Sequence, residues 1–213
     1  MNVLVVGESE ADELALRLLI AGIVGDPTTY PSGPSLRRRS RGLGAVYKSL
    51  ESILYYAMWK TDAEGLAIIV DSDMDLPHDD SRNVACPCRR CNLEREIAKI
   101  RKRIRNPNRQ FWVGVAMAVP KIESWCLVQR SKEVGEVEWQ RMDNAARQSL
   151  HSRLKLMLYD TDRPDLELEK RKVREAIEEI VARDDGIELL SRKFPYGFGH
   201  FAEKLRNYRA QLT

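Results

Sequence analysis

The chain has 213 residues and a net charge of +3, and its composition is 43% hydrophobic and 31% charged. A chain of this length buries about 70% of the surface that its unfolded form exposes, so neither a disulfide framework nor a metal is needed for folding. No apolar run reaches the roughly 20 residues that span a bilayer, and the first residues lack the basic region of a secretory signal. We therefore expect a cytoplasmic protein with no membrane partner.

The first half of the chain alternates strand and helix patterns. Residues 3–6 are a Val and Leu run that is typical of a buried parallel strand, and residues 12–23 suit a mostly buried helix that Gly25 ends. The other elements predicted here are a short strand at 28–30, a helix at 45–59, a strand at 65–70, a basic helix at 93–105, a strand at 111–119 and a helix that begins at 122.

The second half of the chain is helical and charged. Helices are predicted at about 137–159, 166–184 and 200–211, with turns at 160–165 and 192–199. Alternating strands and helices predict an α/β fold with a parallel sheet flanked by helices. We therefore expect an α/β catalytic domain over 1–130, with a helical C-terminal extension over 131–213 packed on it. His151, on a charged predicted helix, is expected to have no chemical role.

Acidic residues follow two of the predicted strands. Glu8 comes just after the first strand, and Asp71, Asp73 and Asp75 follow the strand at 65–70. Ligands of open parallel sheets bind beyond the carboxyl ends of the strands, and alternate residues of an extended turn point to the same side. Carboxylates are the ligands that Mg²⁺ prefers. These acids therefore predict a divalent-metal site, although Asp75 suits a loop or capping role equally well.

The sequence around these acids resembles the Toprim family. Residues 6–13 (VGESEADE) are similar to the V-E-G-x-T-D-E opening of Toprim domains, and residues 69–75 (IVDSDMD) to their later strand and D-x-D turn. Residues 119–125 (VPKIESW) are similar to the P-x-I-E-x-W helix start of small OLD-like Toprim proteins, and segments 37–44 and 194–198 also fit that subgroup. The resemblance implies a Toprim/Rossmann-like sheet.

The resemblance also implies a function. Toprim nucleases cleave DNA or RNA with Mg²⁺ or Mn²⁺, and some OLD-like relatives belong to phage-defence systems. Glu8 would then be a general acid or base, or a metal ligand, Asp71 and Asp73 would ligate Mg²⁺, and Glu123 would be a further catalytic acid. OLD-type nucleases use an ATPase, which would have to be a separate partner. The chain departs from the family at Ser9, where glycine is usual.

Two other functions remain open. The first is a non-catalytic nucleic-acid-binding or partner-docking module that has kept the fold. The second is a nucleotide-binding α/β protein, which the absence of a G-x-x-x-x-G-K-[ST] phosphate loop disfavours. Asp12 and Glu13 lie where acids complement the dipole of a helix N-terminus, and we expect this local role for them.

Basic residues form two groups in the sequence. Arg37, Arg38, Arg39 and Arg41 lie within five positions beside Gly42. Arginine clusters neutralise phosphate backbones and form bidentate phosphate contacts, so this group predicts a nucleic-acid contact. The second group lies within 88–109, and its residues 99–109 suit a solvated helix face nearly as well.

Three of the four cysteines lie within six residues. Cys86, Cys88 and Cys91 can each supply a thiolate, and structural Zn²⁺ takes four tetrahedral nitrogen or sulfur ligands. The sequence therefore predicts a structural zinc site, and the alternative is a set of reduced thiols in an exposed loop. Three residues are candidates for the fourth ligand: His78, Cys126 and His200.

Overall fold

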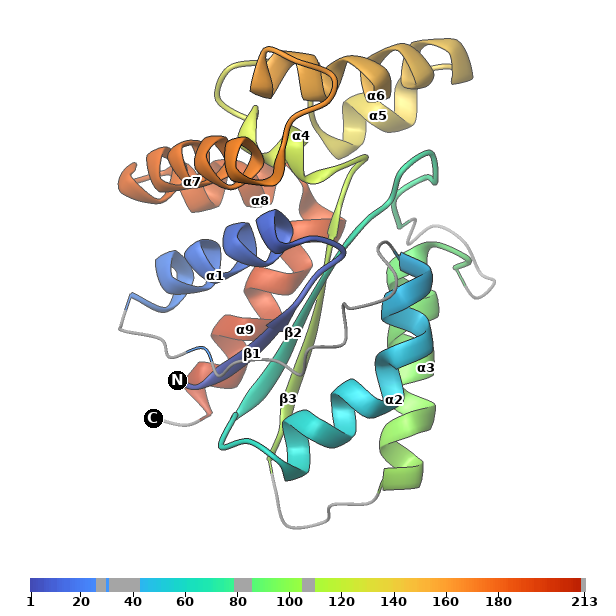
Figure 1. The fold of residues 1–213 in the computed structure, drawn as a ribbon, viewed down its shortest axis with the longest axis vertical. Helices are drawn as coiled ribbons and strands as arrows, with labels where there is room; N and C mark the ends of the chain where they lie inside the picture. Colours follow the sequence, from blue (N-terminus) through green and yellow to red (C-terminus); the bar gives the residue numbers. More distant parts are fainter. Residues whose placement is uncertain (26–29, 31–42, 79–85, 105–109, 212–213) are drawn as a thin grey trace.

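In the computed structural model of the chain, the described residues are 1–25, 30, 43–78, 86–104 and 110–211. They form a mixed α/β fold in which helices flank a parallel sheet (Figure 1). Within these residues the sheet contains the strands β1 (Val3–Val6), β2 (Gly65–Asp71) and β3 (Trp112–Ala118), in the order β1-β2-β3. The predicted α/β class and parallel sheet are confirmed, and the central position of β2 agrees with the apolar run over 65–70.

The strands form because continuous apolar runs can be covered on both faces of a parallel sheet. Six of the seven residues of β2 are buried, and all seven residues of β3 are buried. β2 pairs with β3 from Gly65 opposite Trp112 to Asp71 opposite Ala118. The strand predicted at 28–30 falls outside the described residues except for Tyr30, which is in neither a helix nor a strand.

Helices cover both faces of this sheet (Figure 1). Helices α1 (Glu10–Val24) and α9 (His200–Ala210) lie on one face, and α2 (Leu43–Trp59) and α3 (Arg89–Ile104) lie on the other. Helix α7 (Leu166–Ala182) packs on the outer side of α1. Across the described residues, no helix is both long enough and apolar enough to cross a membrane.

Helix α9 covers the face of β3 through aromatic contacts. The ring of Trp112 meets that of Phe201 edge-on, with centroids 5.6 Å apart, and lies 6.1 Å from the ring of Tyr208. Phe201 is fully buried. The sheet is therefore completed by a helix that is far from it in the sequence.

The remaining helices include three at the carboxyl ends of the strands (Figure 1). These three are α4 (Ile122–Cys126), α5 (Glu136–Arg141) and α6 (Asn144–Tyr159). Helix α8 (Gly186–Lys193) and a π-helical turn, η2 (Pro195–Gly199), precede α9. The predicted division of the chain at residue 130 stays a prediction.

Two predictions about the second half are wrong. The single helix predicted at 137–159 is two helices, because Asp143 caps α6 by accepting a hydrogen bond from the Ala146 N–H at 2.8 Å. The turn predicted at 192–199 is the end of α8 followed by η2. The buried carboxylate of Glu136 holds η2 by accepting hydrogen bonds from the N–H groups of Tyr196 and Gly197, both at 2.7 Å.

Candidate metal centres

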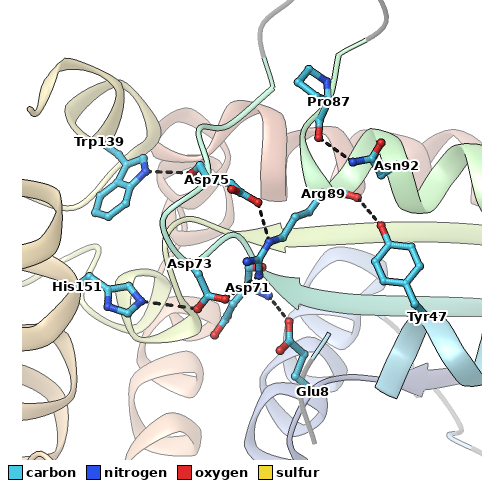
Figure 2. Close-up of polar contacts among 10 residues, drawn as sticks. All are labelled: Glu8, Tyr47, Asp71, Asp73, Asp75, Pro87, Arg89, Asn92, Trp139 and His151. Carbon is cyan, nitrogen blue, oxygen red and sulfur yellow. Dashed lines mark hydrogen bonds and ion pairs between the residues drawn. The ribbon is translucent and has the colours of Figure 1, made fainter. Parts of the chain in front are cut away.

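The carboxyl ends of β1 and β2 bring two of the predicted acids together. The parallel register places Val6 opposite Ile68, so the chain leaving β1 passes the end of β2. The Asp71 N–H donates a 2.9 Å hydrogen bond to Oε1 of Glu8 (Figure 2). Glu8 and Asp71 therefore meet at the edge of the sheet where ligands of such folds bind.

Helix α4 brings a third predicted acid to this edge. Oδ1 of Asp71 accepts a 3.1 Å hydrogen bond from the N–H of Ile122, the first residue of α4. The next residue, Glu123, is only 3% exposed. The pKa of Asp71 is raised well above its usual value, first by burial and then by the negative charges of Asp12, Glu123 and Glu8. Four carboxyl groups thus act on one another here.

Asp12 is the member of this group that sequence reasoning missed. Its predicted local role is present, because it forms a capping box with Ser9 at the start of α1: Asp12 Oδ2 accepts from the Ser9 N–H at 2.8 Å. The side chain is also only 7% exposed, and burial, with the charges of Glu123 and Glu8, raises its pKa to about 7. A carboxylate in the first turn of a helix that starts at a strand end was the available signal.

We call Glu8, Asp12, Asp71 and Glu123 the inner acids. The pKa of each is raised, and burial is the largest cause in every case. Burial and like charges both disfavour the ionised form of a carboxyl group. A bound cation would reverse both effects, so the inner acids have the electrostatic character of a cation site.

Asp73 and Asp75, which we call the outer pair, have a different environment. Arg89, at the start of α3, donates from Nη1 to Asp73 Oδ2 at 2.7 Å and from Nε to Asp75 Oδ2 at 2.8 Å (Figure 2). The same Nη1 donates to the backbone oxygen of Asp71 at 2.9 Å. The guanidinium therefore pairs with both members of the outer pair directly beside the inner acids.

The C-terminal helices also reach the outer pair. His151, on α6, places Nε2 3.6 Å from Oδ1 of Asp73, and Trp139 donates from Nε1 to the Asp75 backbone oxygen at 3.3 Å (Figure 2). The His151 contact and then Arg89 lower the pKa of Asp73 to about 2. The expectation that His151 has no chemical role stays a prediction, although its ring faces a predicted metal ligand.

The turn after β2 is also not the extended segment that the sequence predicts. Asp73 has a left-handed backbone with a φ of +49°, and the Asp75 N–H donates to the Ser72 oxygen at 3.0 Å. The rule that alternate side chains of an extended turn point to the same side therefore does not apply to Asp71 and Asp73. Because of this tight turn, Asp71 contacts Glu8 and Asp73 contacts Arg89.

A second candidate centre lies at the loop that leads into α3. The potential ligand atoms of His78, Cys86, Cys88 and Cys91 all lie within 4.8 Å of one another. Nδ1 of His78 is 3.1 Å from Sγ of Cys91 and 3.9 Å from Sγ of Cys88. Nitrogen and sulfur ligands of one tetrahedral zinc ion are about 3.6 Å apart. These four residues, which we call the thiolate site, can hold a metal ion such as zinc.

The structure selects His78 from the three candidate fourth ligands. Cys126 is buried on α4, and His200 places Nε2 3.5 Å from Oε1 of Glu94. Burial raises the pKa of Cys88 to about 12, so this thiol is ionised only when a cation binds it. Within the described residues, the thiolate site is the one group of His, Cys, Asp or Glu placed to hold a metal, and the inner acids are not in that arrangement.

The two basic groups have different outcomes. The predicted nucleic-acid contacts at Arg37, Arg38, Arg39 and Arg41 lie outside the described residues. In the second group, Arg101 donates to the Phe111 backbone oxygen at 3.0 Å and Arg103 pairs with Glu51 at 3.4 Å. These are contacts within the molecule, and the choice between a nucleic-acid contact and a solvated helix face for this group stays open.

The chain was compared with known proteins at three levels. No protein-family model, no curated protein and no solved structure gives a match.

Proposed function

We propose that this protein is a divalent-metal-dependent nuclease and that the inner acids hold its Mg²⁺ or Mn²⁺. The observation that carries this proposal is the gathering of four carboxyl groups with raised pKa values at the carboxyl ends of β1 and β2. Burial of several carboxyl groups that repel one another destabilises a protein unless a cation or protons neutralise them. A role in metal binding explains why the protein keeps these destabilising carboxyl groups more readily than a role in folding does.

Backbone donors orient three of the inner acids. Glu8 accepts from the Asp71 N–H, Asp71 from the Ile122 N–H and Asp12 from the Ser9 N–H. A carboxylate has two oxygens with about four acceptor positions, so one hydrogen bond leaves capacity for a cation.

The chemistry would be hydrolysis of a phosphodiester. A bound divalent ion polarises a phosphoryl oxygen and lowers the pKa of a bound water. Glu123 is suited to proton transfer, because burial raises its pKa. Lys121, directly before α4, acts electrostatically on both Asp73 and Glu123, and in this proposal its ammonium group would contact the substrate phosphate.

The finer assignments rest on the resemblance to OLD-like Toprim nucleases. They are a Toprim-like fold, a DNA or RNA substrate, a separate ATPase partner and a place in phage defence. A cytoplasmic location is proposed separately, from the absence of an apolar run of bilayer length and of a secretory signal pattern. The thiolate site would carry structural Zn²⁺, distinct from the ion of the inner acids. The arginines at 37–41 would add nucleic-acid contacts.

The test is cleavage of single- and double-stranded DNA and RNA by the full chain with Mg²⁺ or Mn²⁺. Asp71→Asn keeps the size of the side chain and an acceptor for the Ile122 N–H, so it removes charge without removing the fold. Asp62→Asn, at an exposed position, is the matched control. We expect cleavage by the wild type and the control but not by Asp71→Asn. Full activity of Asp71→Asn would exclude the assignment, and metal-independent binding without cleavage would favour the docking module.

A further inference from the structure

The thiolate site and the outer pair share the same two chain segments. Asp75 and His78 lie three residues apart in the loop after β2. Cys88, Arg89 and Cys91 lie together at the start of α3. The two segments are therefore joined twice, once by the four possible metal ligands and once by the ion pairs of Arg89.

The ion pairs alone are a weak way to join these segments. The side chains of Asp73 and Asp75 are 42% and 54% exposed, and that of Arg89 is 21% exposed. Ion pairs this close to solvent are screened and hold little energy. A four-ligand zinc ion holds its ligands far more strongly, and here two of its ligands flank Arg89 within one turn of helix.

We propose that a Zn²⁺ ion bound by His78, Cys86, Cys88 and Cys91 positions Arg89 on Asp73 and Asp75, and thereby sets the charge next to the inner acids. Zinc loading then regulates the affinity of the inner acids for their divalent ion, a step that rests on the proposed function. Arg89 is a positioning residue in this scheme and not a catalytic one. Its Nη1 is already 2.9 Å from the backbone oxygen of Asp71, so its charge reaches the inner acids.

The direction of the effect follows from charge. A guanidinium fixed beside the inner acids repels a divalent cation, so release of Arg89 tightens Mn²⁺ binding, by roughly three- to tenfold for one charge at this range. Zinc with three thiolates and one neutral histidine carries a net charge of −1, and its loss has a direct effect of the opposite sign. Arg89→Gln isolates this direct effect, because it lacks the guanidinium.

The first experiment is a two-by-two comparison on the full chain. Mn²⁺ binding is measured by electron paramagnetic resonance for the wild type and Arg89→Gln, each with zinc and after zinc removal by a chelator that is then dialysed away. For each protein, the Mn²⁺ Kd without zinc is divided by the Mn²⁺ Kd with zinc. We expect this ratio to differ between the wild type and Arg89→Gln by roughly three- to tenfold. An equal change of the Mn²⁺ Kd in the two proteins on zinc removal would overturn the proposal. Metal analysis that finds no bound zinc would also overturn it.

The second experiment does not depend on Mn²⁺ binding, so it separates this proposal from the proposed function. The Nε–H signal of Arg89 in a ¹⁵N NMR spectrum is assigned by its loss in Arg89→Gln. We expect a resolved, slowly exchanging signal with zinc, because Nε donates to Asp75, and an averaged signal without zinc. A signal unchanged by zinc removal would overturn the proposal whatever the Mn²⁺ result.

A folding control accompanies both experiments. The indole of Trp125 is fully buried and distant in sequence from the thiolate site, so its signal reports whether the core is intact. If zinc-free protein loses the Trp125 signal, the experiment uses the variant His78→Gln with zinc in place of zinc-free protein, because the three thiolates of this variant can still hold the ion. In that variant a loosened Arg89 signal with an intact Trp125 signal supports the proposal, and an unchanged Arg89 signal contradicts it.

Discussion

The inner acids and the outer pair are neighbours that meet the problem of repulsion between like charges in opposite ways. Among the inner acids, Asp12 and Glu123 are buried and Glu8 and Asp71 are partly buried. The pKa values of all four are raised, to about 7 for Asp12. The outer pair is half-exposed and forms ion pairs with Arg89, and the contacts with His151 and Arg89 lower the pKa of Asp73 to about 2. The two aspartates of one D-x-D sequence can therefore differ in chemistry, because burial and like charges raise the pKa of Asp71, whereas His151 and Arg89 lower the pKa of Asp73.

The largest expected difference is in catalysis. Asp71→Asn should lower the initial rate of cleavage with Mn²⁺ by at least about 100-fold, because loss of even an indirect metal contact costs 10- to 100-fold. Asp75→Asn should change the rate by only a few-fold, since Asp75 pairs with Arg89. Equal losses in the two variants would remove the distinction between the inner acids and the outer pair.

The next largest effect is on stability without metal. The pKa of Asp12 is raised in the folded protein from 3.8 to about 7, so the folded state binds this proton more tightly than the unfolded chain. The resulting stabilisation is complete below pH about 4 and is lost as the pH rises through about 7, which amounts to about 2–3 kcal/mol between pH 5 and pH 8. Urea unfolding at the two pH values measures this change.

Asp12→Asn provides the control for that measurement. Asparagine keeps an acceptor for the Ser9 N–H, so the capping box survives in part while the titration is removed. The variant should lose less stability than the wild type between pH 5 and pH 8. An identical loss would show that Asp12 does not titrate in this range.

Metal binding by the inner acids should release protons. Because the pKa of Asp12 is about 7, this carboxyl group is roughly half protonated at pH 7, and a divalent ion would displace about half a proton from it. Calorimetry of Mn²⁺ binding in two buffers of different ionisation enthalpy measures this number. An enthalpy that is the same in both buffers would contradict the assignment of the ion to the inner acids.

The smallest effect concerns the outer pair and has the opposite sign. The pKa of Asp73 is lowered, so its contribution to stability is present above its usual value of 3.8 and is lost as the pH falls through about 2. The size is reduced by solvent screening, because the side chain is 42% exposed. Asp73→Asn should therefore flatten the acid side of the stability profile slightly. A steeper acid side in this variant would argue against the ion pair with Arg89.

Much of the sheet could be predicted, because short, continuous apolar runs are typical of strands that are buried on both faces. The strand predicted at 65–70 differs from β2 by one residue at one end, and the strand predicted at 111–119 differs from β3 by one residue at each end. Gly25 ends α1 with a φ of +71°, as its sequence position indicates. The break before α6 could not be found from periodicity, because the helical pattern continues across it. Asp143 was the cap that could have shown it.

The candidate site divides in the same way. Glu8 and Asp71 follow from strand ends, which are local in sequence, whereas the sequence left His78 equal to two other candidate ligands although it shares a loop with the cysteines. Arg89 and His151 could not be found from sequence, because their contacts with Asp73 depend on how α3 and α6 pack. A charge on a predicted helix does not reveal which residue it faces.

The packing of α9 on β3 has a consequence for biosynthesis. Trp112 lies against Phe201 and Tyr208, so this face of the strand remains uncovered on the ribosome until about ninety further residues have been translated and have emerged. Contacts between residues so far apart in sequence form slowly, and exposed apolar strands aggregate in the interval. Chaperones that bind nascent chains would therefore be expected to act on this protein before α9 arrives.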